Sequence, residues 1–108
     1  MSVMLVVTNV PDREVALRIA RALLEKRLAA CVNILAECHS VYRWRGEVEA
    51  AAEVPLLVKT RTQLYAQVEA LIRSLHPYEL PEIIGVDVEH GLPAYLDWVA
   101  AETASETQ

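Results

Sequence analysis

The chain has 108 residues, of which 54% are hydrophobic, and a formal net charge of −5. This length and composition predict a single domain spanning residues 1–108, with enough apolar side chains to form a core. Charged residues interrupt the apolar runs well before the roughly 18 consecutive positions that a membrane span needs. The acidic balance and the lack of a long basic cluster argue against nucleic acid as a partner. We therefore expect neither a membrane nor a nucleic-acid partner.

The cysteines and the start of the chain both bear on the cellular compartment. Cys31 and Cys38 are too few for a disulfide framework and lack the spacing of a zinc ribbon. The opening segment, MSVMLVVTNV, has neither the basic stretch nor the small-residue cleavage site of a secretory signal. We expect a cytoplasmic protein with reduced thiols.

The first predicted elements are a strand and a helix. An apolar, β-branched run over residues 3–8 predicts a strand that is covered on both faces. The segment NVPD then begins a helix, because Pro11 suits a first helical turn and the acidic Asp12 and Glu14 favour the positive end of the helix dipole. The buried stripe of this helix is predicted to consist of Val15, Ile19, Ala20, Leu23 and Leu24.

A second extended segment is unusually long. It begins at Ala30 and reads ACVNILAECHSVYRWRG, far beyond the roughly five or six residues of a typical strand. We interpret its far end as a hairpin that reverses at Arg45 and Gly46, where glycine supplies the positive φ of a tight turn. The return strand lies within EVEAAAEVPLLVKT, whose first part, EVEAAAE, is equally compatible with a helix or a bulged strand.

The next helix has the clearest pattern. Its apolar face consists of Leu64, Val68, Leu71, Ile72 and Leu75. Thr60 or Thr62 is expected to cap its start. Pro77 ends the helix, and because the residue before a proline is pushed out of the α region, we expect His76 to be extended.

A strand and a helix complete the predicted domain. The strand covers EIIGVDVE, and the helix runs from Ala94 to about Thr103, with a docking face of Tyr95, Trp98 and Val99. The last residues, ASETQ, are typical of a frayed tail.

The order of these elements predicts an α+β fold. It matches a ferredoxin-like split βαβ sandwich, an antiparallel sheet with helices on one face, here with an extended hairpin and a C-terminal helix. The hairpin would reach past the sheet and leave strand edges carrying Tyr42 and Trp44 open to another chain. We therefore expect a ring-like homo-oligomer, specifically a trimer.

Four stretches, in this order and spacing, resemble the CutA (CutA1) divalent-cation tolerance family: LAACVNI, SVYRWRGEVE, LHPYELPEI and GLPAYLDWV. They cover most of residues 28–99. The resemblance implies a cytoplasmic homotrimer, related in architecture to the PII signalling proteins, with a role in tolerance to copper and other divalent metals. We expect metal binding without enzymatic turnover, since the sequence has no glycine-rich phosphate loop, nucleophile elbow or HExxH motif.

The predicted metal ligands are His76, Cys31 and Glu79, and the expected ion is copper or another divalent cation. A neutral imidazole suits copper or zinc, and the histidine of the family's HPYE segment falls on His76. Cys31 matches the cysteine of the ACVN segment and would supply a soft thiolate, while Glu79 would add oxygen ligands. The structural alternatives are a histidine that bonds the last free carbonyl groups of a helix and a cysteine that packs as a small apolar residue.

A second candidate site is a cleft between subunits. Tyr42 and Trp44 share one face of their strand, and comparison with the family suggests that Glu53 and Lys59 lie near them. Interface packing is the structural alternative, because interfaces are enriched in tyrosine, tryptophan and arginine. Two further hypotheses for function follow: a PII-like trimeric sensor that binds a small anionic ligand in the cleft, and a scaffold for a protein partner.

Overall fold

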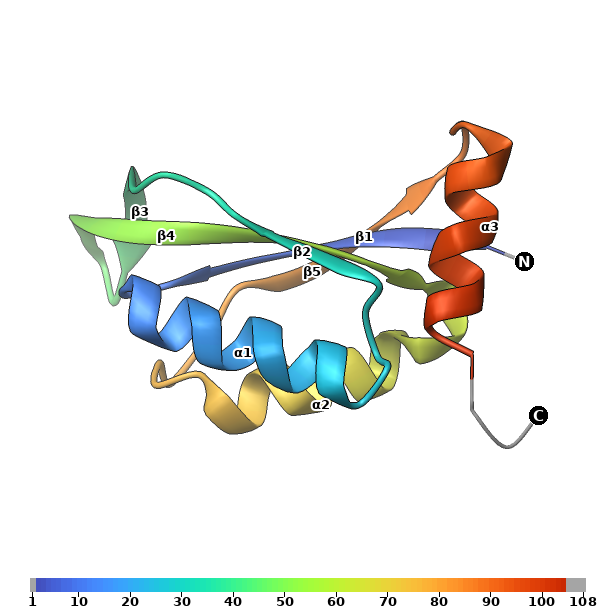
Figure 1. Ribbon diagram of the computed structural model, residues 1–108. Coiled ribbons are helices and arrows are strands. Elements are labelled where there is room, and N and C mark those ends of the chain that lie inside the picture. Colours follow the sequence, from blue (N-terminus) through green and yellow to red (C-terminus); the bar gives the residue numbers. More distant parts are fainter. Residues whose placement is uncertain (1, 105–108) are drawn as a thin grey trace.

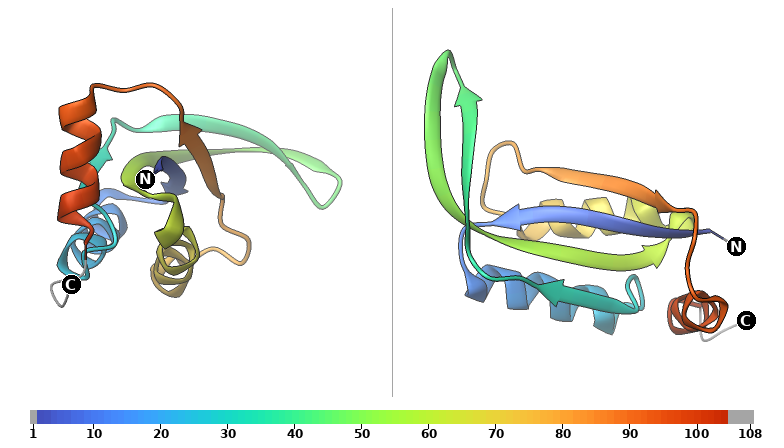
Figure 2. Two further views of the ribbon diagram at one scale, coloured as in Figure 1. Left: turned by 90° about the vertical axis from the view of Figure 1, so that its right-hand side faces the viewer. Right: turned by 90° about the horizontal axis from the view of Figure 1, so that it is seen from above.

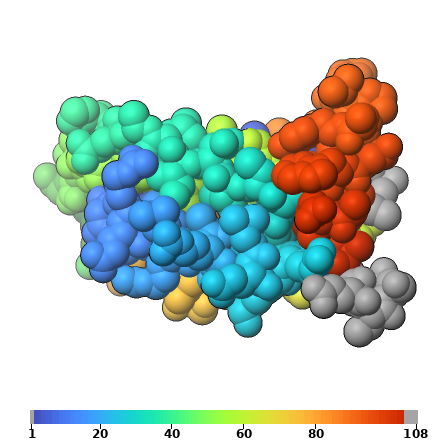
Figure 3. Space-filling view, in the orientation of Figure 1, coloured from blue at the N-terminus to red at the C-terminus, as the bar shows by residue number. Residues whose placement is uncertain are grey.

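The computed structural model describes residues 2–104. Its elements are β1 (Val3–Val10), α1 (Arg13–Glu25), β2 (Cys31–Ile34), β3 (Cys38–Trp44), β4 (Glu47–Arg61), the 3-10 turn η1 (Thr62–Leu64), α2 (Tyr65–Leu75), β5 (Ile83–Val88) and α3 (Pro93–Glu102). The molecule is elongated, 48 × 26 × 23 Å, with the β3-β4 hairpin at one end and α3 at the other (Figures 1 and 3). Within the described part of the chain, no helix has the length and apolarity needed to span a membrane.

The strands form an antiparallel sheet in the order β2-β4-β1-β5. This is the strand order of a ferredoxin-like split βαβ fold, so the predicted α+β class is confirmed. Helices α1 and α2 lie side by side on one face of the sheet, and α3 crosses its end (Figures 1 and 2). Within residues 2–104, most of the opposite face therefore has no helix over it.

The core lies between the sheet and the two helices α1 and α2. Val6 of β1 and Val58 of β4 are partners across the strands, and both are fully buried. The helices contribute Ile19, Leu23 and Ile72, which are also fully buried. Each such side chain stabilises the folded state by about 1.5–3 kcal/mol through its removal from water. The predicted face of α2 is confirmed, because its members are either buried or packed against this cluster.

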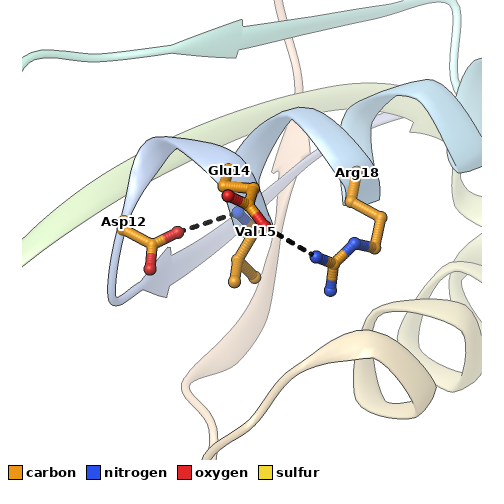
Figure 4. Close-up of polar contacts among 4 residues, drawn as sticks. All are labelled: Asp12, Glu14, Val15 and Arg18. Atoms are coloured by element: carbon orange, nitrogen blue, oxygen red, sulfur yellow. Dashed lines mark hydrogen bonds and ion pairs between the residues drawn. The ribbon is translucent and has the colours of Figure 1, made fainter.

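The start of α1 is fixed by a side-chain cap (Figure 4). The carboxylate of Asp12 accepts a hydrogen bond of 2.9 Å from the N–H of Val15. Glu14 and Arg18, one turn apart, form an exposed ion pair of 3.3 Å. The prediction placed Pro11 in the first turn, but the helix begins at Arg13, so proline precedes the cap.

The buried stripe of α1 is shifted from the predicted one. The predicted members that are buried are Ile19, Ala20 and Leu23. Ala16 is fully buried beside them, Val15 is half-buried, and Leu24 is 44% exposed. Because each helical residue advances by about 100°, the residue after the fully buried Leu23 turns toward solvent.

The start of α2 also differs from prediction. The turn η1 precedes α2. The N-cap residue of α2 is Leu64, which makes no side-chain hydrogen bond. Thr60 cannot cap the helix because it is part of β4 and faces the core, where its hydroxyl donates a 2.6 Å hydrogen bond to the carbonyl of Leu28. The end of the helix is as predicted, with His76 extended at φ −80° and ψ 130°.

The β3-β4 hairpin is built on one continuous strand. The outer half of β4, residues 47–53, pairs with β3, and its inner half lies between β1 and β2. The helical alternative for EVEAAAE is therefore wrong. Arg45 and Gly46 form the turn, with φ of 51° and 84°, as predicted for a tight reversal. The strand predicted from Ala30 is divided, because residues 35–37 leave the ladder and separate β2 from β3.

The last helix is held by its end rather than by its aromatic side chains. Val99 is fully buried, but Tyr95 and Trp98 of the predicted docking face are 40% and 42% exposed. The guanidinium of Arg61 donates to the hydroxyl of Thr103 at 2.9 Å and to its carbonyl at 2.8 Å. Of the predicted tail ASETQ, residues 105–108 lie outside the described residues.

Candidate functional site

A groove of about 670 Å³ lies between the hairpin and the loop that joins α2 to β5. Tyr42 and Trp44 of β3 and Glu53 of β4 form part of one wall. Tyr78 and Glu79 of the loop form part of the other. Three of the four cleft residues predicted from the sequence thus meet in one groove of a single chain.

The strand period explains why these hairpin side chains share a face. Residues two apart on a strand point to the same side, which places Tyr42 with Trp44. In the antiparallel register Tyr42 lies opposite Glu49, and Cys38 lies opposite Glu53, so Glu49 and Glu53 follow the same face of β4. The hairpin therefore presents both aromatic and acidic side chains toward the loop.

His76 fixes the base of the loop. Its side chain is 8% exposed, and its Nε2 lies 2.7 Å from the main-chain oxygen of Asn9. A carbonyl oxygen only accepts, so Nε2 donates, while Nδ1 accepts a 3.2 Å hydrogen bond from the N–H of Tyr78. The ring is thus neutral with its proton on Nε2. The structural alternative is therefore wrong about the partner, since the carbonyl belongs to β1 rather than to the preceding helix.

Tyr78 and Glu53 join the loop to the hairpin. Glu53 is only 9% exposed and hydrogen-bonds the Tyr78 hydroxyl. Burial, followed by this hydrogen bond and the charge of Glu53, raises the pKa of Tyr78 to about 12. Each of these effects favours the neutral phenol over the phenolate. Within residues 2–104, no lysine, arginine or histidine forms an ion pair with Glu53.

Arg45 makes a second connection at the tip of the hairpin. Its Nη2 lies 3.0 Å and 3.4 Å from the two carboxylate oxygens of Glu79. Its guanidinium carbon also lies 5.2 Å from the centre of the Trp44 ring. This arrangement combines a charge-assisted hydrogen bond with a cation–π contact at the rim of the groove.

The predicted metal ligands do not form one cluster within a chain. His76 uses both ring nitrogens in hydrogen bonds, and Glu79 pairs with Arg45. Cys31 lies on β2, at the face of the sheet that α1 and α2 leave open. Among the described residues, no group of three or more histidine, cysteine, aspartate or glutamate side chains is placed to hold a metal ion. The described side chains of one chain therefore do not form a metal site by themselves.

Lys59 lies beside Cys31 instead of lining the groove. The two residues are partners across β2 and β4, with 4.0 Å between Nζ and Sγ. Lys59 also donates to the side-chain oxygen of Asn33. Tyr95 of α3 reaches the same place, where burial raises the pKa of its hydroxyl and the Cys31 thiol adds to the rise.

Sequence reasoning missed the contacts that close the groove. Tyr78 and Arg45 were not predicted as site residues, although Tyr78 lies in the HPYE segment. Their partners are Glu53 and Glu79, 25 and 34 positions away along the chain. No local periodicity encodes such pairs, because they depend on how the loop docks against the hairpin.

The fold and the groove define a class of protein: a ferredoxin-like domain with a projecting hairpin and a loop docked against it. The chain belongs to the CutA1 divalent ion tolerance protein family, whose model matches residues 4–102. It is 47% identical over 98 residues to the Divalent-cation tolerance protein CutA of Thermus thermophilus, covering 91% of this chain and 95% of that protein. It is 46% identical over 95 residues to Protein CutA of Mus musculus, of which it spans only 54%.

Solved structures agree with this assignment. The crystal structure of CutA from Xylella fastidiosa matches with a TM-score of 0.93 and 41% identity, covering 96% of this chain and 100% of that one. The structure of the divalent cation tolerance protein from Thermus thermophilus matches with a TM-score of 0.92 and 45% identity, covering 94% of this chain and 99% of that one. The family recognised in the sequence is thereby confirmed.

Proposed function

We propose that this protein serves in tolerance to divalent metal ions, copper among them, as a cytoplasmic homotrimer that binds metal without catalytic turnover. Membership of the CutA1 divalent ion tolerance family supports the tolerance role, and the name of the Thermus thermophilus relative describes a tolerance protein, not an enzyme. The observation that carries the assembly is the open face of the sheet.

Part of this open face, over β1, β4 and β5, is apolar. In the register of the sheet, Val7 of β1 lies between Leu57 of β4 and Ile84 of β5, and Leu5 follows on the same face next to Val86. Ile84 and Val86 are each 51% exposed. A contiguous apolar surface of this kind is the usual mark of a protein interface. A second and third copy of the chain would bury it.

The hairpin supports assembly in a second way. The pairing of β1 with β4 ends at Val10 and Val54. Beyond this point, residues 47–53 pair with β3 on one edge only. The free edge presents backbone N–H and C=O groups that another strand can satisfy. Strand addition between copies would extend the sheet from one subunit into the next.

Metal ligands would then come from more than one copy. Cys31 is the leading ligand because its thiol is only partly buried and a thiolate suits copper. Glu79 would supply oxygen from the exposed rim of the groove. His76 would first have to give up its hydrogen bond from Tyr78, so its metal role is the less favourable one.

Native mass spectrometry of the purified protein, with and without added copper and zinc, tests the proposal. We expect a trimer that gains bound metal. Cys31→Ser should lose that metal, while Cys38→Ser, which removes the other partly buried thiol, should keep it. Val86→Glu should reduce the mass to a monomer, and Leu17→Glu on the exposed side of α1 should not.

Each part of the proposal can fail separately. A wild-type monomer at micromolar concentration would contradict the assembly. A trimer that takes up no metal, or takes it up equally in both cysteine variants, would contradict the metal site. Loss of metal in His76→Ala alone would move the site to the loop.

A further inference from the structure

The groove between the hairpin and the loop is acidic. Among its described lining residues, Glu49, Glu53, Glu79 and Glu82 face a single basic residue, Arg43. A concave site with this excess of negative charge attracts cations and repels anions. The lining therefore disfavours the small anionic ligand considered from the sequence.

Glu53 is the most buried of these charges. Its carboxylate is 9% exposed and has the Tyr78 hydroxyl as a neutral partner, with no ion pair from residues 2–104. Burying a carboxylate without a cationic partner costs free energy. An ionised carboxylate also accepts about four hydrogen bonds, so one hydroxyl leaves most of its capacity unused. This carboxylate lines the groove and lacks a cation there.

The chain itself shows how such a groove holds a cation. At the rim, the guanidinium of Arg45 lies over the Trp44 ring and bonds both oxygens of Glu79. Deeper in the same lining, Glu53 lies with the rings of Tyr42 and Tyr78. The deeper position thus repeats the combination of carboxylate and aromatic surface, but without the guanidinium.

We propose that the groove binds a small organic cation with a guanidinium head on an apolar chain. The head would bond Glu53, and the chain would lie against the rings of Tyr42 and Trp44. A volume of about 670 Å³ is within the usual range for a small-molecule site. All the lining residues come from one chain, so the inference does not rest on the metal role, and it requires that the groove stay open in the proposed trimer.

Titration calorimetry with butylguanidinium, in the presence of a chelator, tests this ligand class. Butylurea is its neutral isostere. Its affinity should be at least about ten-fold lower, because it lacks the charge. Glu53→Gln should weaken butylguanidinium binding by about ten-fold or more. Glu25→Gln removes the same charge from an exposed position on α1, outside the groove, and should leave the affinity unchanged.

A second variant keeps the proposal testable if Glu53→Gln does not fold. Tyr42 is 40% exposed, so Tyr42→Leu should fold, and it should weaken binding about five-fold through loss of its aromatic face. Native mass spectrometry of Glu53→Gln should show wild-type oligomer mass and metal uptake, which separates this site from the proposed function.

Three results would overturn the inference. The first is no binding of butylguanidinium, or equal binding of butylurea. The second is the same loss of affinity in Glu25→Gln as in Glu53→Gln, which would reduce the effect to net charge. The third is a wild type that does not bind the cation, together with a Glu53→Gln variant that dissociates into smaller oligomers. That result would mean that Glu53 pairs with a basic side chain of a second copy.

Discussion

The imidazole Nε2 of His76 donates a 2.7 Å hydrogen bond to the main-chain oxygen of Asn9, 67 positions earlier in the chain. The other ring nitrogen accepts from the N–H of Tyr78. A single buried side chain therefore ties β1 to the loop that forms one wall of the groove. The histidine that the sequence marks as a metal ligand has a structural role in each subunit, whatever else it binds.

Replacing His76 by alanine should destabilise the fold. The change leaves the Asn9 carbonyl and the Tyr78 N–H without this partner and opens a cavity, which we expect to lower the free energy of unfolding by about 2–4 kcal/mol. His39→Ala, at an exposed position of β3, should change it by less than about 0.5 kcal/mol. Urea unfolding at matched protein concentration measures both, and equal losses would contradict the bridging role.

The stability of the protein should fall at high pH in a way that depends on Tyr78. The pKa of its hydroxyl rises from 10.0 to about 12 in the folded chain, so folding favours the neutral phenol. This contribution is fully present below pH 10 and is lost as the pH rises from 10 to about 12. Phenolate absorbance should show a late step near pH 12 that disappears in Tyr78→Phe. A late step that survives the substitution would contradict the assignment.

Two buried threonines should respond differently to the same substitution. The hydroxyl of Thr60 donates to the Leu28 carbonyl at 2.6 Å, so Thr60→Val should cost about 1–3 kcal/mol. The hydroxyl of Thr8 is buried without a hydrogen-bond partner among the described residues, so Thr8→Val should be neutral or stabilising. Thermal unfolding compares the pair. A larger loss in Thr8→Val would reverse this reading of the two sites.

The stability of the hairpin turn should depend on the backbone conformation of Gly46 and not on the space around it. Gly46 has φ of 84°, and a Cβ built on it would meet no atom within 4 Å. Gly46→Ala should therefore cost about 1–2 kcal/mol, the usual penalty for a left-handed residue. Gly46→Asn should cost less, because asparagine adopts this conformation more readily. Melting temperatures that fall equally in both variants would indicate a steric cause instead.

Much of the fold could be predicted because its signals are local. The β-branched run of β1, the apolar face of α2 and the restriction that Pro77 places on His76 each act within a few residues. The errors lie where tertiary packing decides. Thr60 resembles a helix cap in sequence. However, β4 continues to Arg61, and the hydroxyl of Thr60 bonds the carbonyl of Leu28.

The groove was predictable only in part. The alternation of β3 places Tyr42 and Trp44 on one face, and the family pattern adds Glu53. Tyr78 and the Arg45–Glu79 pair depend on the position of a loop relative to a hairpin, which no spacing in the sequence records. Lys59 was misplaced for the same reason, because it is on the inner half of β4, beside Cys31.

The exposed edge of β4 also raises a question of solubility. A strand edge that is open over residues 47–53 would template fibre growth if it were apolar and flat. In this segment, however, Glu47, Glu49 and Glu53 lie on one face of the strand. Their mutual repulsion discourages the stacking of identical hairpins in register. The β3-β4 hairpin can therefore expose this strand edge to a partner of matching shape without promoting aggregation.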